Sequence, residues 1–445
     1  MLRVSSMMDK KRRSHILTLL FVFSFFYIVY PLYGEPSMFI YILCLVGYIV
    51  GAYCFFKIKN KTNYFDFDVL FIFIYGLVAY STTPFYYNES LYKALFVGYF
   101  FDVKYVNAGN VLSTIGILAY FWGGISIRTK NSKYQVKPLI RTRGMSVLLL
   151  ILTLLFVVMG GRAYSQSAYN EGAGSYSGLI PYILLFLTYL SIVIITTELY
   201  NKKFHHSYII DRLSIISIII VSLILLTGGS RSDASNIALP VIGVYTMLLS
   251  PMKLKRTMLF LLFGIIVMWV IGKVRTGDVV SEVANPVLTL IDLTVPSRSN
   301  YAVFEYVTDK GFSYGSSFVG LFTVIPFLSS ATGMTEGSAE LLTTSFIDNN
   351  PGYPIIGLGT TVIADIYIAF GFIGVLTIMY ILGRFVNRSF VGASELNYYS
   401  LITYAALLSI SVFIVRGSCT LPIRPVIWCL VIAHINYKMQ LSQNK

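Results

Sequence analysis

The sequence predicts an all-α polytopic membrane protein with about twelve transmembrane helices. Of its 445 residues, 56% are hydrophobic and only 12% are charged, and the mean hydropathy is +0.72. A soluble domain carries about a quarter charged residues, so this chain has too few polar side chains to cover a water-facing surface. Its apolar residues also gather into runs of roughly 16 to 25, long enough to cross a bilayer as helices. The chain 1–445 is therefore interpreted as a single integral membrane domain.

Twelve apolar runs account for the predicted spans. The first run follows the basic residues Lys10, Lys11, Arg12 and Arg13, and it is too long for the apolar stretch of a signal peptide. It is therefore interpreted as a retained signal anchor. The runs lie near residues 16–33, 38–56, 67–82, 111–127, 144–160, 179–198, 213–227, 236–250, 257–272, 356–383, 398–415 and 425–437.

The positive charges orient these predicted helices. With the N-terminus inside the cell, most of the 34 Lys and Arg residues fall in cytoplasmic segments, and none falls within a span. This bias is typical of helical membrane proteins. The net charge of +14 is therefore attributed to membrane orientation and not to binding of nucleic acid. Because the number of spans is even, both termini are expected in the cytoplasm.

One long connection, residues 273–355, is predicted on the opposite side of the membrane. Loops of this length usually carry function. Its segments 286–295 and 318–328 are apolar but too short to span, which favours short interfacial helices. A small folded cap with its own core is an equal alternative. The other sizeable outside segment, 83–110, contains a similar apolar stretch at 91–101.

Six arginines lie on this outer side, against the usual charge bias. Most of them sit at the mouths of spans and beside glycine, which lets a ligand approach the backbone closely. A guanidinium group is suited to bidentate recognition of phosphate. The set therefore predicts a binding site for a lipid pyrophosphate or its sugar, whereas contact with phospholipid headgroups is the alternative for each arginine alone. The six are Arg162, Arg231, Arg275, Arg298, Arg416 and Arg424.

Charge within the predicted spans is nearly confined to Asp365. Counted from residue 356, it lies about nine residues into the tenth span, or roughly 13 Å deep at about 1.5 Å per residue. A carboxylate at that depth contacts substrate or serves as counter-ion to an arginine, and the structural role is preferred. The glycines of the same span are expected to allow close helix packing. They are Gly357, Gly359, Gly371 and Gly374.

Carboxylates are the remaining choice for a general base on the outer side, because the four histidines lie in or near cytoplasmic segments. Asp365 is kept as a tentative catalytic residue. No metal-ligand constellation or phosphate-binding loop is present in the sequence, so neither a metal nor another cofactor is expected. The other candidate carboxylates are Asp233, Asp278, Glu282, Asp292, Glu305 and Asp348.

These features, taken in order, make the chain resemble the O-antigen or oligosaccharide repeat-unit polymerases (Wzy type) of bacterial inner membranes. The resemblance covers roughly the C-terminal two-thirds. It rests on GGSRSDASNI, KVRTGD, FTVIPF, NNPGYPIIGLGTTVIADIYIAFGFIG, and the VRG and PIR of the last outside turn. It implies a glycosyltransferase C-like membrane fold with a periplasmic active face.

The resemblance also implies an activity, namely that of a metal-independent membrane glycosyltransferase of lipopolysaccharide biosynthesis. Its substrates would be undecaprenyl-pyrophosphate-linked oligosaccharides. The growing chain would pass from its carrier lipid to the non-reducing end of a new repeat unit. Such polymerases usually work with a chain-length regulator protein. Among the arginines, Arg231, Arg275 and Arg416 match the family most clearly, with Arg162 and Arg424 next.

Two departures from the family leave the catalytic base undetermined. Several relatives have a histidine where this chain reads NNPGY at residues 349–353, and a spaced Arg-Gly loop motif is not reproduced cleanly after Arg162 or Arg298. Two other functions stay open. A flippase or other transporter of the same lipid-linked sugars would be expected to have short loops and charges at several depths. An O-antigen ligase would be expected to keep the outside histidine.

Overall fold

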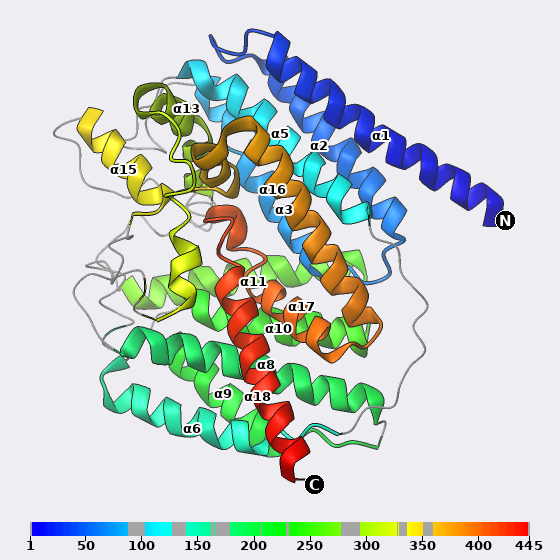
Figure 1. Ribbon diagram of the computed structural model, residues 1–445, viewed down its shortest axis with the longest axis vertical. Coiled ribbons are helices and arrows are strands. Elements are labelled where there is room, and N and C mark those ends of the chain that lie inside the picture. Colours follow the sequence, from blue (N-terminus) through cyan, green and yellow to red (C-terminus); the bar gives the residue numbers. More distant parts are fainter. Residues whose placement is uncertain are drawn as a thin grey trace.

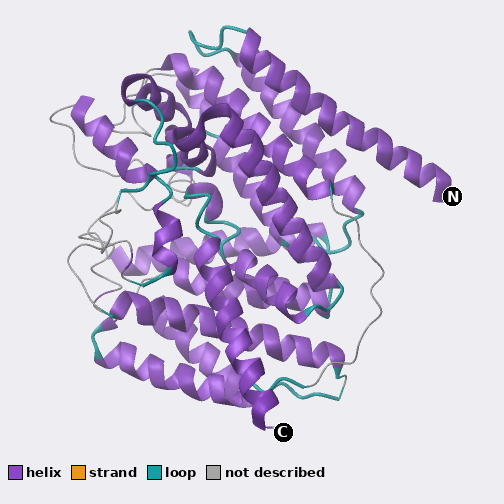
Figure 2. Ribbon diagram, in the orientation of Figure 1, coloured by secondary structure: helices purple, strands orange, loops and turns teal. Residues whose placement is uncertain are grey.

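The computed structural model describes residues 2–87, 103–126, 139–161, 164, 179–205, 207–227, 231–276, 294–326, 328, 336–349 and 359–443. Over these residues the chain forms helices and loops and no strand (Figure 2). The predicted all-helical fold class is thereby confirmed. The predicted interfacial segment 91–101 and most of segment 286–295 lie outside the described residues, as does Arg162.

The α-helices coincide with each of the twelve predicted apolar runs and add two helices between residues 294 and 349. They are α1 (Leu2–Val29), α2 (Met38–Lys59), α3 (Phe67–Tyr80), α5 (Val106–Ile125), α6 (Arg143–Val158), α8 (Ile180–Phe204), α9 (Arg212–Thr227), α10 (Arg231–Leu248), α11 (Leu254–Thr276), α13 (Ser299–Lys310), α15 (Ser338–Asn349), α16 (Val362–Ser394), α17 (Tyr398–Ser409) and α18 (Ile423–Gln443). Short 3₁₀ helices are η1 (Thr83–Tyr87), η2 (Val103–Tyr105), η6 (Val295–Arg298), η7 (Val319–Val324) and η8 (Ile414–Arg416).

Six of the described helical segments are long and apolar enough to cross a membrane. α6 and α9 are apolar but shorter. Large apolar side chains such as Phe21 (70% exposed) and Val158 (75% exposed) cover the outer surface, where a water-soluble protein would carry polar groups. The chain is thus a helical membrane protein, while the number twelve stays a prediction. The six segments are Lys11–Val29, Met38–Lys59, Phe67–Tyr86, Val103–Ile125, Ile180–Phe204 and Val362–Ser394.

Helix α5 forms the centre of one half of the molecule, because every residue in it except Trp122 is buried. It packs backbone to backbone against α16. A Cβ atom added to Gly123 would lie 2.0 Å from the Tyr380 carbonyl oxygen, and one added to Gly383 would lie 2.1 Å from the Tyr120 carbonyl oxygen. Small residues allow this close approach. Such packing stabilises helix pairs in a membrane, where the hydrophobic effect does not drive helices together.

The helices form two groups with α17 between them. Figure 1 shows α1, α2, α5 and α16 side by side in the upper half, and α6, α8 and α9 stacked in the lower half. Helix α17 contacts α16 in the first group, and both α8 and α10 in the second. Helix α18 runs down the lower half to the C-terminus and contacts α17, α8 and η7 (Figure 1).

Helix α16 differs from the predicted tenth span at its start and in its middle. It begins at Val362 and not near residue 356, because Thr361 caps it by accepting a hydrogen bond from the Ala364 N–H at 3.2 Å. Asp365 therefore lies in the first turn and not nine residues deep. Gly371 interrupts the helix with φ 62° and ψ −154°, a conformation that glycine adopts without strain. Gly371 thus introduces a kink in α16, in addition to the close packing expected of the glycines in this span.

Helix α17 is shorter than the predicted span 398–415. Its regular hydrogen bonding ends at Ser409, and residues 410–413 form turns that lead into η8. The long segment 273–355 also differs from its prediction. The expected helix at 318–328 is the 3₁₀ helix η7, and α13 buries Tyr301 and Phe304 against α5 and α16. The described part of this segment thus packs on the bundle as a cap would.

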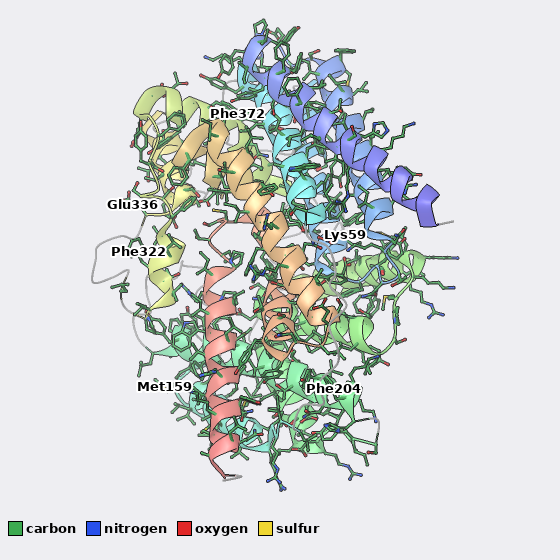
Figure 3. The ribbon with its side chains drawn as sticks, turned by 45° about the vertical axis from the view of Figure 1, so that its right-hand side comes forward. Lys59, Met159, Phe204, Phe322, Glu336 and Phe372 are labelled. Atoms are coloured by element: carbon green, nitrogen blue, oxygen red, sulfur yellow. The ribbon has the colours of Figure 1, made fainter. Side chains whose placement is uncertain are left out.

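Residues predicted on opposite sides of the membrane also lie on opposite sides of the molecule. In Figure 3, Met159, Phe322 and Glu336 lie on the left, whereas Lys59 and Phe204 lie on the right. Phe322 and Glu336 belong to a predicted periplasmic segment and Met159 to the predicted periplasmic end of the span 144–160, whereas Lys59 and Phe204 belong to predicted cytoplasmic segments. The two sides are called the predicted periplasmic end and the predicted cytoplasmic end below.

Candidate functional site

A short turn at the predicted periplasmic end carries two of the predicted arginines. Residues 417–422 join η8 to α18, so Arg416 ends the 3₁₀ helix just before the turn and Arg424 lies in the first turn of α18 after it. Both side chains are half-buried. The two arginines, eight residues apart in the sequence, therefore flank the same turn.

Asp365 fastens this turn to α16. Its Oδ2 accepts a hydrogen bond from the Ser418 hydroxyl at 2.9 Å and another from the Cys419 backbone N–H at 2.9 Å. The carboxylate is fully buried. Among the described residues, its hydrogen-bond donors are these two groups and Ser338, and it pairs with no arginine. The preferred counter-ion role is thus replaced by a different structural role, which is to position the turn.

The Asp365 carboxylate also contacts the cap, which here means helices α13 and α15. Ser338 begins α15, and its hydroxyl donates to Asp365 Oδ1 at 2.6 Å. The neighbouring Thr361 hydroxyl donates to the Asn300 side-chain oxygen on α13. Helices α13 and α15 and the turn 417–422 therefore all join the first turn of α16 through buried hydrogen bonds, which are costly to leave unmade.

The 3₁₀ helix η7 lies against the same turn. A Cβ atom added to Gly320 would lie 2.1 Å from the Thr420 hydroxyl oxygen, so the η7 backbone approaches the turn directly. The Trp428 indole N–H donates to the Val324 carbonyl at 2.8 Å and joins η7 to α18. Phe322 of η7 lies at the left of the molecule in Figure 3, below Glu336. The part of the motif FTVIPF that belongs to η7, residues 322–324, thus lies beside the arginine-bearing turn.

Arg424 connects the turn to the second group of helices. Its side chain lies close to the hydroxyl of Tyr189 on α8, and Asp233 in the first turn of α10 lies within electrostatic reach of the same tyrosine. Tyr164 is close to Asp233 as well, and burial followed by this carboxylate raises the pKa of the Tyr164 hydroxyl. Charged and phenolic groups from α8, α10 and α18 therefore gather beside the turn.

The remaining predicted arginines are placed differently. Arg231 opens α10 and Arg275 lies next to the last residue of α11, but their side chains lie outside the described part of the structure. Arg298 is buried, with 3% of its surface exposed, and its Nε donates to the Val295 carbonyl at 3.1 Å. It holds the base of the cap and does not face the surface. The structure thus places Arg416 and Arg424 at the two ends of one turn, whereas Arg298 is buried beside α13.

A second charged cluster, at the predicted cytoplasmic end, was missed by the sequence analysis. Lys59 Nζ and Lys61 Nζ lie 3.0 and 2.9 Å from Asp68 Oδ2, and Lys61 also pairs with Asp66. Tyr120 of α5 donates to Asp68 Oδ1 at 2.7 Å. Both lysines had been attributed to membrane orientation alone. The spacing of two lysines and two aspartates within ten residues was the available signal.

Burial alone would lower the pKa of Lys61, but the carboxylates of Asp66 and Asp68 beside it raise that pKa above its ordinary value. The lysine is therefore held in its charged form.

No group of three or more His, Cys, Asp or Glu side chains is close enough to hold a metal ion in the part of the chain that the structure describes. Comparisons with protein-family models, curated proteins and solved structures found no match for this chain.

Proposed function

We propose that the protein is a polymerase that joins undecaprenyl-pyrophosphate-linked oligosaccharide repeat units at the periplasmic face of a bacterial inner membrane. The observation that carries the proposal is the turn 417–422, which bears Arg416 and Arg424 and is fastened to α16 by Asp365. Guanidinium groups on a fixed backbone suit a pyrophosphate, because their donors match its oxygens without reorganisation.

The reaction transfers the growing glycan to a new repeat unit. The bond between the anomeric carbon and the pyrophosphate oxygen breaks, and its electron pair leaves with the carrier lipid pyrophosphate. A hydroxyl oxygen of the acceptor sugar forms the new glycosidic bond and loses its proton. Arg416 and Arg424 stabilise the charge that develops on the leaving pyrophosphate. Asp365 acts as a positioning residue, since a buried carboxylate with three donors has no free access to a sugar.

Asp233 is the carboxylate best suited to take the acceptor's proton. It is half-buried in the first turn of α10, close to Tyr164 and within electrostatic reach of Tyr189, which lies close to the side chain of Arg424. By contrast, Asp348 is exposed and pairs with Lys310 at 3.1 Å. An Asp233→Asn variant that still binds lipid-linked substrate should lose turnover, because a general base contributes to the transition state.

Deletion of the gene tests the class of function. A polymerase mutant should display surface glycolipid that carries a single repeat unit, because flipping and ligation continue without it. Complete loss of the capped glycolipid would instead indicate that the protein is the flippase or the ligase. Complementation with the wild-type gene should restore the long polymer.

Substitution of the arginines tests the site. Arg231→Ala and Arg416→Ala should each abolish polymer while the protein still reaches the membrane. Arg416→Lys should restore little, because an ammonium group cannot bind phosphate in a bidentate manner. Arg388→Ala is the matched control, since Arg388 is an exposed arginine at the other end of α16. Normal chain length in both alanine variants would rule out a pyrophosphate site at these arginines.

A further inference from the structure

A cavity of about 430 Å³ lies between α8, α9, α10 and α11 at the predicted cytoplasmic end. Its volume falls within the range of about 300–1,000 Å³ that is usual for small-molecule pockets. Ile195 and Leu199 of α8 face Val241 and Ile242 of α10 across it. Tyr245 also lines the cavity and is 48% exposed, so the cavity opens on the molecular surface. It is far from the arginine-bearing turn, which lies at the other end of the molecule.

Buried polar contacts hold one wall of the cavity in place. Asn63, in the loop between α2 and α3, donates to the Thr246 hydroxyl at 3.2 Å and accepts from the Met252 N–H at 3.0 Å. The Tyr64 N–H donates to the Met252 carbonyl at 2.9 Å. Thr246 and Met252 both line the cavity. The turn between α10 and α11 is thus fixed in the shape that leaves the space open.

The opposite wall is fixed by Glu198, a fully buried carboxylate on α8. Its Oε2 accepts hydrogen bonds from the Tyr208 hydroxyl at 3.0 Å and from the Asp211 N–H at 3.1 Å. These bonds hold the segment 208–211, including the lining residue Ile210, against α8. The cavity is therefore built by specific polar contacts around an apolar interior.

The mouth of the cavity is positively charged. Arg256 lines it from the first turn of α11, and Lys253 and Lys255 are exposed beside it. Arg256 forms no ion pair with any residue that the structure describes. Burial of the apolar wall favours a hydrocarbon chain, and the free guanidinium favours a phosphate group. Membrane proteins bind anionic lipid headgroups in basic pockets between helices on the cytoplasmic side.

We propose that this cavity binds one anionic glycerophospholipid of the cytoplasmic leaflet, with an acyl chain between α8 and α10 and the phosphate at Arg256. The apolar lining excludes a purely water-soluble phosphate as the occupant, because such a ligand would leave Ile195 and Val241 in contact with water. The bound lipid would fasten α11 to α8 and α10 at an end where the described protein contacts leave an open space.

Native mass spectrometry of the protein in mild detergent tests this site. Phosphatidylglycerol and phosphatidylcholine with the same acyl chains are added in equal amounts. The wild-type protein should retain one phosphatidylglycerol in about tenfold preference, because the choline ammonium of phosphatidylcholine offsets the charge of its phosphate and weakens its attraction to Arg256. Arg256→Ala should remove the preference, and Val241→Trp, which fills the cavity, should remove bound lipid of both kinds. Arg388→Ala should behave as wild type.

The outcomes that overturn the proposal are equally specific. Equal retention of both lipids by the wild-type protein would exclude a site selective for anionic lipid, and an unchanged preference in Arg256→Ala would exclude Arg256 as its charged group. Displacement of the signal by inorganic phosphate alone would show a simple anion site and not a lipid site. If Val241→Trp fails to fold, Arg256→Ala still decides the question, because Arg256 is exposed and its removal leaves no cavity in the core.

Discussion

The carboxylate of Asp365 accepts a hydrogen bond from the backbone N–H of Cys419 at 2.9 Å. Together with the bonds from Ser338 and Ser418, this contact makes one buried side chain the junction between α15, α16 and the turn that bears Arg416 and Arg424. No substitution at residue 419 except proline removes this backbone N–H. The position of the turn therefore depends on whether the side chain at residue 365 can accept these hydrogen bonds.

Replacement of Asp365 should destabilise the protein and disconnect the turn. Asp365→Ala leaves three buried donors without their acceptor, and each such loss costs about 1–3 kcal/mol. We expect a clearly lower melting temperature in detergent and loss of polymer. Asp348→Ala is the matched control, because Asp348 is an exposed carboxylate in a surface ion pair worth about 0–1 kcal/mol. Equal melting temperatures and chain lengths for the two variants would contradict the positioning role.

Lys61 should be more important for stability than its place in a loop implies. Lys61→Met leaves Asp66 and Asp68 with an uncompensated buried charge, and the loss of one partner of a buried pair costs about 3–5 kcal/mol. The melting temperature should fall strongly, whereas Lys57→Met, at an exposed position on α2, should change it little. The neutral double variant Lys61→Met with Asp66→Asn should recover part of the loss. A Lys61→Met protein as stable as Lys57→Met would disprove the importance of the cluster.

The raised pKa of Lys61 also gives a pH dependence. Because its pKa is higher in the folded protein than in the unfolded chain, its stabilising contribution is complete below the ordinary lysine value of about 10.4. The contribution is lost as the pH rises through the higher folded value. Melting temperature measured from pH 7 to 11 should therefore stay level and then fall at the alkaline end. The fall should be smaller in Lys61→Met, and an identical profile in both proteins would exclude this lysine as its cause.

The contact between α5 and α16 should not accept a methyl group. Gly123→Ala would place Cβ 2.0 Å from the Tyr380 carbonyl oxygen, which is backbone and cannot rotate away. We expect reduced folding yield and a lower melting temperature. Gly264→Ala is the matched control, because nothing lies within 4 Å of the added atom in α11. That variant should be neutral or gain up to about 1 kcal/mol from better helix propensity.

Cys419 should react slowly with thiol reagents. Burial and the neighbouring Asp365 carboxylate raise the pKa of the Cys419 thiol well above its usual value, so little thiolate is present at pH 8. Peptide mapping after treatment with N-ethylmaleimide should find Cys419 unmodified in the folded protein and modified after unfolding in detergent. A Ser442→Cys variant supplies an exposed reference thiol on α18. Comparable labelling rates at the two positions would argue against the buried contact with Asp365.

The positions of the helices were predictable from the sequence, because apolar runs of sufficient length have few alternatives in a bilayer. The start of α16 was not. The apolar character of residues 356–361 suggested helix, whereas Thr361 caps the helix by taking the Ala364 N–H. Capping depends on one side chain and one dihedral angle, and hydropathy does not report either. The depth assigned to Asp365 was incorrect for this reason.

The partners of Asp365 could not be predicted at all. Ser338 lies 27 residues before it and Cys419 lies 54 residues after it, in segments with no pattern that relates them. The arginine pair was easier, since Arg416 and Arg424 flank one short turn. Arg298 looked equivalent to them in sequence, yet it is buried at the base of the cap. Only packing distinguishes a buried arginine from one that faces a surface.

Lys59 and Lys61 have consequences at two different times in the life of the protein. While the chain is being inserted, α3 has not yet packed, and the two ammonium groups act as unpaired charges that favour the predicted cytoplasmic side for this loop. Once α3 and α5 assemble, Asp66, Asp68 and Tyr120 neutralise and bury them. In the folded protein, the lysine charges that oriented the loop are therefore paired and no longer exposed. Removal of either lysine would accordingly impair biogenesis first and the mature fold afterwards.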